Sequence, residues 1–153
     1  MNAEEEQHID SGHFHAVIVS RMAHVPAAIV WDAWADPVKM SAWFSEDTLH
    51  DLNIGGRYSN GDGDQGEFLE VIPGSHLKFT WEQPDYTPGS YVMVDIRPAG
   101  DEAAEIRVEH ANVACQDADD LDLGWNWSLD SLVSYLETGA PIPFEEWAAG
   151  RQY

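Results

Sequence analysis

"DADDLDLGWNWSLDSLVSYLETG", residues 117–139, is the stretch that decides the fold. Its apolar residues recur at spacings of four, four, three and four, as Leu121, Trp125, Leu129, Leu132 and Leu136. This spacing aligns them on one face of an α-helix of about five turns. Aspartates crowd its start, where the helix dipole favours anions, and Gly139 followed by Pro141 favours its end. The segment is therefore predicted to be a long amphipathic helix with one buried face.

The chain before this helix is expected to form one strand, two short helices and about six further strands. Residues 13–25 are rich in β-branched residues and are predicted to form the first strand. Two helices are predicted over residues 27–35 and 38–44, because Asp36 and Pro37 end the first and cap the second. This order of elements indicates an α+β protein.

Turns rich in glycine, asparagine, aspartate and proline separate the later strands. Residues 76–82, 91–97 and 104–110 alternate apolar and polar side chains, and the last inward-facing row ends at His110. We therefore predict a curved antiparallel sheet wrapped around the long C-terminal helix, which covers one of its faces. A gap between such a sheet and one helix is a place where a pocket can form.

Residues 1–153 are expected to form a single domain, because 44% of them are hydrophobic, which suffices for one sizeable core, and no internal repeat is present. Residues 1–12 are acidic and without periodicity, so a loose tail is expected. Residues 141–153 are expected to form a C-terminal tail that folds back through Phe144 and Trp147.

The composition is strongly acidic: 28 aspartate and glutamate residues against 7 lysine and arginine residues give a formal charge of −21. Such a charge argues against nucleic acid and anionic lipid as partners. Adaptation to high salt and docking of a basic partner are the two explanations, and the spread of acids along the whole chain favours the first. The thermal midpoint is then expected to rise between low salt and molar KCl.

Several classes of site are not expected. No apolar stretch is long enough to span a membrane and no secretory signal is present, so a cytoplasmic location is expected. Cys115 is the only cysteine, so no internal disulfide can form. His13 and His15 lie two apart on a predicted strand but have no third ligand at a recognisable spacing. Neither a metal site nor a cofactor is therefore expected.

Four stretches together carry a family resemblance: VPAAIVWDAWADPVKMSAWF, LNIGGRY, GEFLEVIPGSHLKFTWE and GWNWSLDSLVSYLETG, at residues 25–44, 52–58, 66–82 and 124–139. In this order they resemble the START and birch-pollen-allergen superfamily, also called SRPBCC. Within it, the chain is similar to the activator of the heat-shock protein 90 ATPase. The resemblance implies a helix-grip fold with an apolar cavity between sheet and C-terminal helix. Because the group includes cochaperone domains, lipid carriers and cyclases, the fold does not settle the function.

The chain is rich in aromatic residues, and several tryptophans around the long helix favour a lined pocket over a solid core. Burial in the core alone would also explain any single one of them. The residues expected to line the pocket are Trp43, Tyr58, Phe79, Trp81, His110, Trp125 and Leu129. The Tyr58 hydroxyl, Glu70 or His110 would orient the polar end of a ligand.

Glu70 and His110 are also the weak candidates for acid–base catalysis. If the side of Phe68 and Ile72 faces the interior, Glu70 shares that side and its buried carboxyl can act as an acid or base. If Leu69 and Val71 face the interior instead, Glu70 lies on the surface. The alternation of this strand does not decide between the two.

The favoured function is non-enzymatic binding of a small apolar or amphipathic molecule in the cavity. The first alternative is a module that docks a chaperone, as its protein partner, through the surface. The second is a small cyclase or hydrolase that uses Glu70 or His110 in the same cavity. A cavity filled with side chains would favour the interaction module, whereas a buried carboxylate close to His110 would favour the enzyme.

Overall fold

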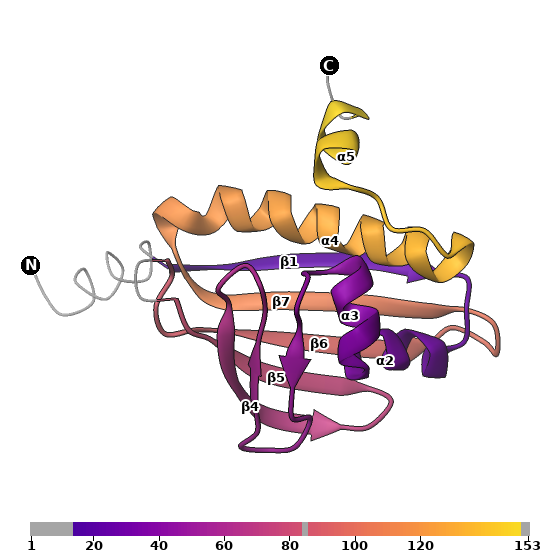
Figure 1. Ribbon diagram of the computed structural model, residues 1–153, viewed down its shortest axis with the longest axis horizontal. Helices are drawn as coiled ribbons and strands as arrows, with labels where there is room; N and C mark the ends of the chain where they lie inside the picture. Colours follow the sequence, from indigo (N-terminus) through magenta and orange to yellow (C-terminus); the bar gives the residue numbers. More distant parts are fainter. Residues whose placement is uncertain (1–13, 84–85, 151–153) are drawn as a thin grey trace, which may run out of the picture.

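The computed structural model describes residues 14–83 and 86–150. They form a curved seven-stranded sheet, two short helices after the first strand, a long helix on one face of the sheet and a short C-terminal helix (Figure 1). The elements are β1 (Phe14–Ala23), α2 (Ala27–Ala35), α3 (Pro37–Trp43), β2 (Leu49–His50), β3 (Arg57–Ser59), β4 (Gln65–Ile72), β5 (His76–Trp81), β6 (Ser90–Pro98), β7 (Ala104–Ala114), a 3₁₀ turn (Cys115–Asp117), α4 (Ala118–Thr138) and α5 (Phe144–Gly150).

The strands follow the order β1-β7-β6-β5-β4-β3-β2, and neighbours are antiparallel throughout. The first strand is therefore placed beside the last one. Helix α4 packs against β1 and β7 (Figure 1), and α2 contacts β6, β7 and α4. A long helix held by a curved antiparallel sheet is the helix-grip arrangement, so the predicted α+β fold is confirmed.

Helix α4 ends where the sequence predicts. The residues of its predicted apolar face are buried or half-buried in the core: Leu121, Trp125, Leu129, Leu132 and Leu136. Gly139 follows the last turn at a φ of 85°, in the left-handed region that glycine adopts at little cost. Its N–H donates to the Tyr135 carbonyl oxygen at 2.9 Å, which satisfies one of the free carbonyls at the helix end.

The inner face of the sheet is apolar because every second side chain of its central strands points toward α4. Three cross-strand pairs of β6 and β7 lie almost wholly out of solvent there: Val92 and His110, Val94 and Val108, and Ile96 and Ile106. Polar His110 thus stands at the end of an apolar row, as the sequence indicates.

Gly66 on β4 allows the edge of the sheet to close tightly. A Cβ at this position would collide with the Thr80 carbonyl oxygen and with the Tyr58 ring, so only glycine fits without a shift. Because Gly66 has no side chain, the Tyr58 ring can lie close to Thr80, and its hydroxyl donates a 2.6 Å hydrogen bond to the Thr80 carbonyl oxygen. Gly66 therefore fixes the Tyr58 ring against the inner face of the sheet.

The segment after α4 folds back and forms α5. The Trp147 indole N–H donates to Asp130 Oδ2 at 2.9 Å, and the Trp127 indole N–H donates to the Ile142 carbonyl oxygen at 2.7 Å. Phe144 packs edge-on against Trp127, with ring centroids 5.7 Å apart. Three aromatic rings therefore hold this segment on the outer side of α4.

The predicted acidic tail and His13 lie outside the described residues. The predicted first strand is observed as β1, from Phe14 to Ala23. None of the helices in residues 14–83 and 86–150 has the length and apolar character needed to cross a lipid bilayer.

Candidate ligand-binding site

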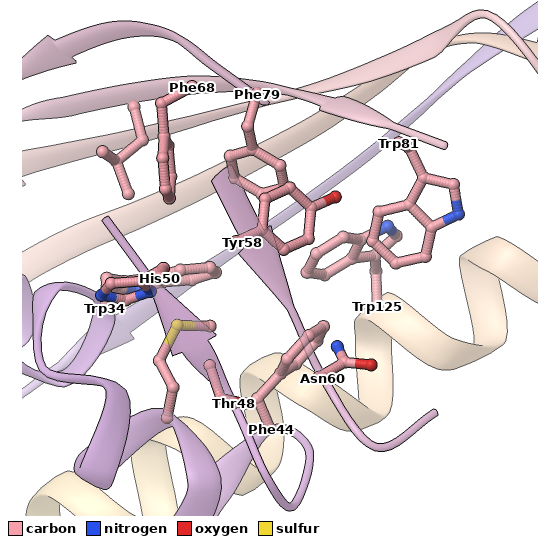
Figure 2. A pocket seen from close by; sticks show the side chains of 12 residues that line it. Trp34, Phe44, Thr48, His50, Tyr58, Asn60, Phe68, Phe79, Trp81 and Trp125 are labelled. Atoms are coloured by element: carbon pink, nitrogen blue, oxygen red, sulfur yellow. The ribbon is translucent and has the colours of Figure 1, made fainter. Parts of the chain in front are cut away.

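A cavity lies between the sheet, α2, α3 and α4, and we call it the inner cavity. Its lining side chains are Trp34, Met40, Phe44, Thr48, His50, Tyr58, Asn60, Phe68, Leu77, Phe79, Trp81 and Trp125 (Figure 2). Its volume is about 30 Å³. That is room for one or two water molecules, whereas pockets for drug-sized ligands measure roughly 300–1,000 Å³. The expected space between sheet and helix is therefore largely filled with side chains.

Aromatic rings of the sheet form the floor of the inner cavity. The rings of Tyr58, Phe68 and Phe79 meet one another with centroids between 5.2 and 5.9 Å apart. These edge-on and tilted contacts are the favoured geometries of aromatic pairs. Burial raises the pKa of the Tyr58 hydroxyl, so the group stays protonated and keeps its hydrogen bond to Thr80. The floor is thus rigid and apolar.

Three rings close the inner cavity toward solvent: Phe44, Trp81 and Trp125. Phe44 stacks on Trp125 at 5.8 Å between centroids, and Trp81 lies 6.1 Å from Trp125. The same three rings line a second hollow, which we call the outer groove and whose volume is about 200 Å³. We refer to these rings as the aromatic partition, because they separate the inner cavity from the outer groove.

His110 lies behind the partition and does not line the inner cavity. The Trp125 indole N–H donates to His110 Nδ1 at 3.1 Å, and His110 Nε2 lies 2.9 Å from Ser90 Oγ. Since an indole nitrogen can only donate, Nδ1 is the acceptor, and the imidazole proton of the neutral form is on Nε2. Burial lowers the pKa of His110 to about 4. Both nitrogens are therefore occupied in a neutral ring, so His110 is neither free to orient a ligand nor placed to take a proton from Ser90.

Trp43 and Leu129, two further residues of the predicted lining, belong to the core. The Trp43 indole N–H donates to the Ala33 carbonyl oxygen at 2.8 Å, and its ring packs edge-on against Trp34 at 4.8 Å. Leu129 is fully buried in α4. Of the seven residues that the sequence places around the pocket, Tyr58, Phe79, Trp81 and Trp125 line the inner cavity.

Glu70 lies on the outer face of the sheet, away from the inner cavity. A β-bulge between Phe68 and Glu70 inserts Leu69 as an extra residue, so the alternation of β4 changes at this point. Phe68 faces the interior while the Glu70 side chain is 53% exposed and lies 2.8 Å from His76 Nε2. The expectation that Glu70 shares the side of Phe68 is therefore wrong, and no carboxylate of Glu70 approaches His110.

Some lining residues were not among those predicted, and Phe44 is the most important of them. It follows directly after α3, so helical spacing did not show which of the neighbours Trp43 and Phe44 would face the cavity. His50 is held by a 2.6 Å contact between Nε2 and the Ala35 carbonyl oxygen. A single histidine beside a short strand gives no sequence signal for such a position.

Two indole nitrogens near the inner cavity, those of Trp34 and Trp81, have no hydrogen-bond partner among residues 14–83 and 86–150. Both residues are more than nine-tenths buried. An unpaired buried donor costs roughly 1–3 kcal/mol, so such groups call for an explanation. Within the described part of the chain, no group of three or more histidine, cysteine, aspartate or glutamate residues is arranged to hold a metal ion.

The architecture agrees with known structures. CalU16 from Micromonospora echinospora is 26% identical, covers 82% of this chain and 78% of its own, and superposes with a TM-score of 0.74. PFC0360w, an HSP90 activator from Plasmodium falciparum, is 20% identical over 82% of this chain and 97% of its own, with a TM-score of 0.70. DynU16, a protein of the dynemicin biosynthetic locus, is 29% identical over 82% of this chain and 48% of its own, with a TM-score of 0.71.

The sequence also matches a family model. This model is described as Activator of Hsp90 ATPase homolog 1-like protein, and it matches residues 24–137. No curated protein matches the chain. The matched residues begin directly after β1 and end in the last turn of α4, so they include strands β2 to β7 and the three helices around the inner cavity, α2, α3 and α4. The chain therefore belongs to the family of Activator of Hsp90 ATPase homolog 1-like proteins, within the SRPBCC superfamily.

Proposed function

We propose that this protein is a non-enzymatic carrier or sensor that binds a small apolar or amphipathic molecule between the sheet and α4. The observation that carries this proposal is the aromatic partition, because it separates an apolar inner cavity from a larger outer groove by only one layer of rings. A ligand that displaces these rings would join the two spaces.

Phe44 is the ring of the partition best able to move. It is the C-cap residue of α3, where the N–H groups of Phe44 and Ser45 both donate to the Met40 carbonyl oxygen, and its side chain is only half-buried. Trp125 lies in the middle of α4 and is held by its hydrogen bond to His110. A rotation of Phe44 therefore opens the partition at the lower energetic cost.

Burial of apolar surface would supply the affinity, at about 25 cal/mol per Å² removed from water. The rings of Tyr58, Phe68 and Phe79 offer apolar surface and no unpaired polar atom. Because both catalytic candidates are engaged elsewhere, His110 behind the partition and Glu70 on the outer face, nothing in their geometry favours an enzyme over a binding protein.

Binding of the neutral dye Nile red tests the proposal. We expect saturable binding to the wild-type protein, detected by dye fluorescence and by quenching of tryptophan emission. Trp81→Ala should weaken dye binding by about five- to tenfold, because it removes one ring of the aromatic partition. Phe44→Ala should accelerate association, since it removes the movable ring.

The matched control is Trp31→Ala, which deletes a half-buried tryptophan that does not line the cavity. It should leave dye affinity unchanged, while circular dichroism confirms that all variants remain folded. Absence of saturable binding to the wild-type protein would refute the proposal. So would equal affinities for Trp81→Ala and Trp31→Ala.

A second candidate function is a protein-interaction module for a heat-shock protein 90 ATPase. The small volume of the inner cavity and the description of the matching family favour it. Stimulation of such an ATPase by the protein, without dye binding, would support this alternative. Dye binding without stimulation would support the carrier.

A further inference from the structure

The indole N–H of Trp81 is a buried hydrogen-bond donor without an acceptor. Trp81 is the last residue of β5 and lines both the inner cavity and the outer groove. It is 7% exposed, and its nitrogen has no acceptor among residues 14–83 and 86–150. Figure 2 shows this nitrogen on the edge of the ring that faces away from Tyr58 and Phe79. The unpaired donor therefore belongs to the side of the aromatic partition that borders the outer groove.

The side-chain donors that α4 contributes to the outer groove all have acceptors. The Trp127 indole N–H donates to the Ile142 carbonyl oxygen at 2.7 Å, and the Ser128 hydroxyl donates to a carbonyl oxygen one turn earlier at 2.8 Å. The Trp125 indole N–H donates to His110. The unpaired donor of β5 is thus the exception among the three indoles around this groove.

The chemistry of an indole N–H restricts what can pair with it. The group can only donate, so it requires a lone pair and offers nothing to an ammonium group. Burial of this donor without an acceptor is unfavourable in the free protein. A molecule that displaces the rings of the partition and brings an acceptor to Trp81 removes this penalty, whereas a purely apolar molecule does not. The site therefore favours ligands with a hydrogen-bond acceptor.

The charge of the outer groove restricts the acceptor further. Asp62, Asp64 and Asp120 line this groove, and no basic side chain within residues 14–83 and 86–150 forms an ion pair with them. Asp64 accepts hydrogen bonds from the neutral amides of Gln83 and Asn60, which leave its charge uncompensated. These carboxylates repel an anionic acceptor such as the head group of a fatty acid. The acceptor that fits is therefore uncharged.

We propose that Trp81 determines the specificity of the site and that the ligand is a neutral, largely apolar molecule with a carbonyl-type oxygen. This oxygen accepts a hydrogen bond from the Trp81 indole N–H at the outer groove. The apolar part of the molecule passes the aromatic partition and occupies the inner cavity. This inference rests on the proposed function and names the class of ligand for the same site.

Three probes with one phenyl ring test the inference: acetophenone, α-methylstyrene and benzoate. The second replaces the ketone oxygen of the first by a methylene group of similar size, and the third carries a negative charge. Affinities are measured by NMR titration in about 1 M KCl, where the Debye length of about 3 Å screens the general repulsion between an acidic protein and an anion. We expect both neutral probes to bind, and benzoate to bind at least about tenfold more weakly than acetophenone.

Trp81→Phe removes the indole N–H and keeps an aromatic ring. It should weaken the binding of acetophenone by about three- to tenfold more than that of α-methylstyrene, which corresponds to one neutral hydrogen bond. The infrared carbonyl band of bound ¹³C-labelled acetophenone should lie at lower wavenumber in the wild-type protein than in this variant. The matched control is Trp127→Phe, which removes an N–H of the same groove that is already paired, and should change both affinities by the same factor.

The outcomes separate the two proposals. Equal losses of affinity for the two neutral probes in Trp81→Phe would overturn the inference and leave the proposed function standing, as would benzoate binding as tight as that of acetophenone. If Trp81→Phe does not fold, the wild-type protein provides the test. Acetophenone, but not α-methylstyrene, should then move the Trp81 indole proton resonance downfield, and an unmoved resonance would overturn the inference. Failure of both neutral probes to bind would overturn the proposed function itself.

Discussion

The two faces of the sheet carry opposite chemistry although they share the same strands. The inner face is apolar, and its histidine, His110, is fully buried and neutral. The outer face carries His76, whose two ring nitrogens lie 2.7 Å from Asp95 and 2.8 Å from Glu70. The two histidines, at inward and outward positions of one sheet, therefore have pKa values shifted in opposite directions, down for His110 and up for His76. The face of the sheet to which a side chain points thus decides its chemistry here.

The outer face also holds several of the few basic residues. Arg107 lies 3.1 Å from Glu109, and the Lys78 ammonium lies 4.8 Å from the centre of the Tyr91 ring. These residues are thus engaged on the face opposite to α4. On the other side, the outer groove is lined by three acidic residues, Asp62, Asp64 and Asp120. None of them takes part in an ion pair within residues 14–83 and 86–150.

The largest expected difference between the faces concerns packing. Ile106→Ala removes a fully buried side chain of the inner face and should lower the free energy of unfolding by about 2–5 kcal/mol. Ile18→Ala makes the same change on the outer face, where the residue is 52% exposed, and should cost less than about 1 kcal/mol. Urea denaturation measures both values. Equal losses would show that the two faces are not packed differently.

A smaller effect is expected from the protonation of His110. Its pKa falls from 6.5 to about 4 on folding, so the unfolded chain binds the proton more strongly. The contribution of neutral His110 is therefore present above pH 6.5 and is lost as the pH falls toward 4, to a total of about 3 kcal/mol. The free energy of unfolding measured against pH should fall less steeply for His110→Gln. Parallel curves for the two proteins would contradict the assignment.

The smallest effect on the free energy of unfolding is expected at His76, and its dependence on pH is opposite in sign to that of His110. Burial alone would lower the pKa of His76, but the hydrogen bonds to Asp95 and Glu70 outweigh it and raise the pKa. Its stabilising contribution is thus present below the unfolded value of 6.5 and is lost as the pH rises through the raised pKa. Because Glu70 is half-exposed, Glu70→Gln should cost less than about 1 kcal/mol.

Proton NMR titration of the imidazole signals checks this last prediction. Glu70→Gln should move the His76 midpoint to lower pH, whereas Glu102→Gln, in the exposed turn between β6 and β7, should not. A His76 midpoint below that of His110 would reverse the comparison of the two faces.

The fold could be predicted from the sequence because its strongest signal, the apolar face of α4, is repeated at several positions. The apolar residues of α4 repeat over five positions, and Gly139 ends the helix in a conformation that glycine favours. A single irregular residue changes neither signal. The alternation along β6 and β7 is equally regular, so the inward position of His110 followed from it.

The site was less predictable because single local events decide it. The bulge at Leu69 turns Glu70 to the outer face, and no residue type marks this bulge in the sequence. At the end of α3, the helix termination places Trp43 in the core and Phe44 in the partition. The volume of the inner cavity depends on the rotation of individual rings, which no periodicity describes.

Trp125 has two roles, because its ring is part of the aromatic partition and its indole N–H donates a hydrogen bond to His110. A ligand that displaces the Trp125 indole must also break its hydrogen bond to the His110 imidazole. The Nδ1 nitrogen of His110 would then lose the N–H that donates to its lone pair, and its ¹⁵N resonance would shift. His110, which is fully buried behind the aromatic partition, would thus report by its ¹⁵N resonance whether a ligand occupies the inner cavity.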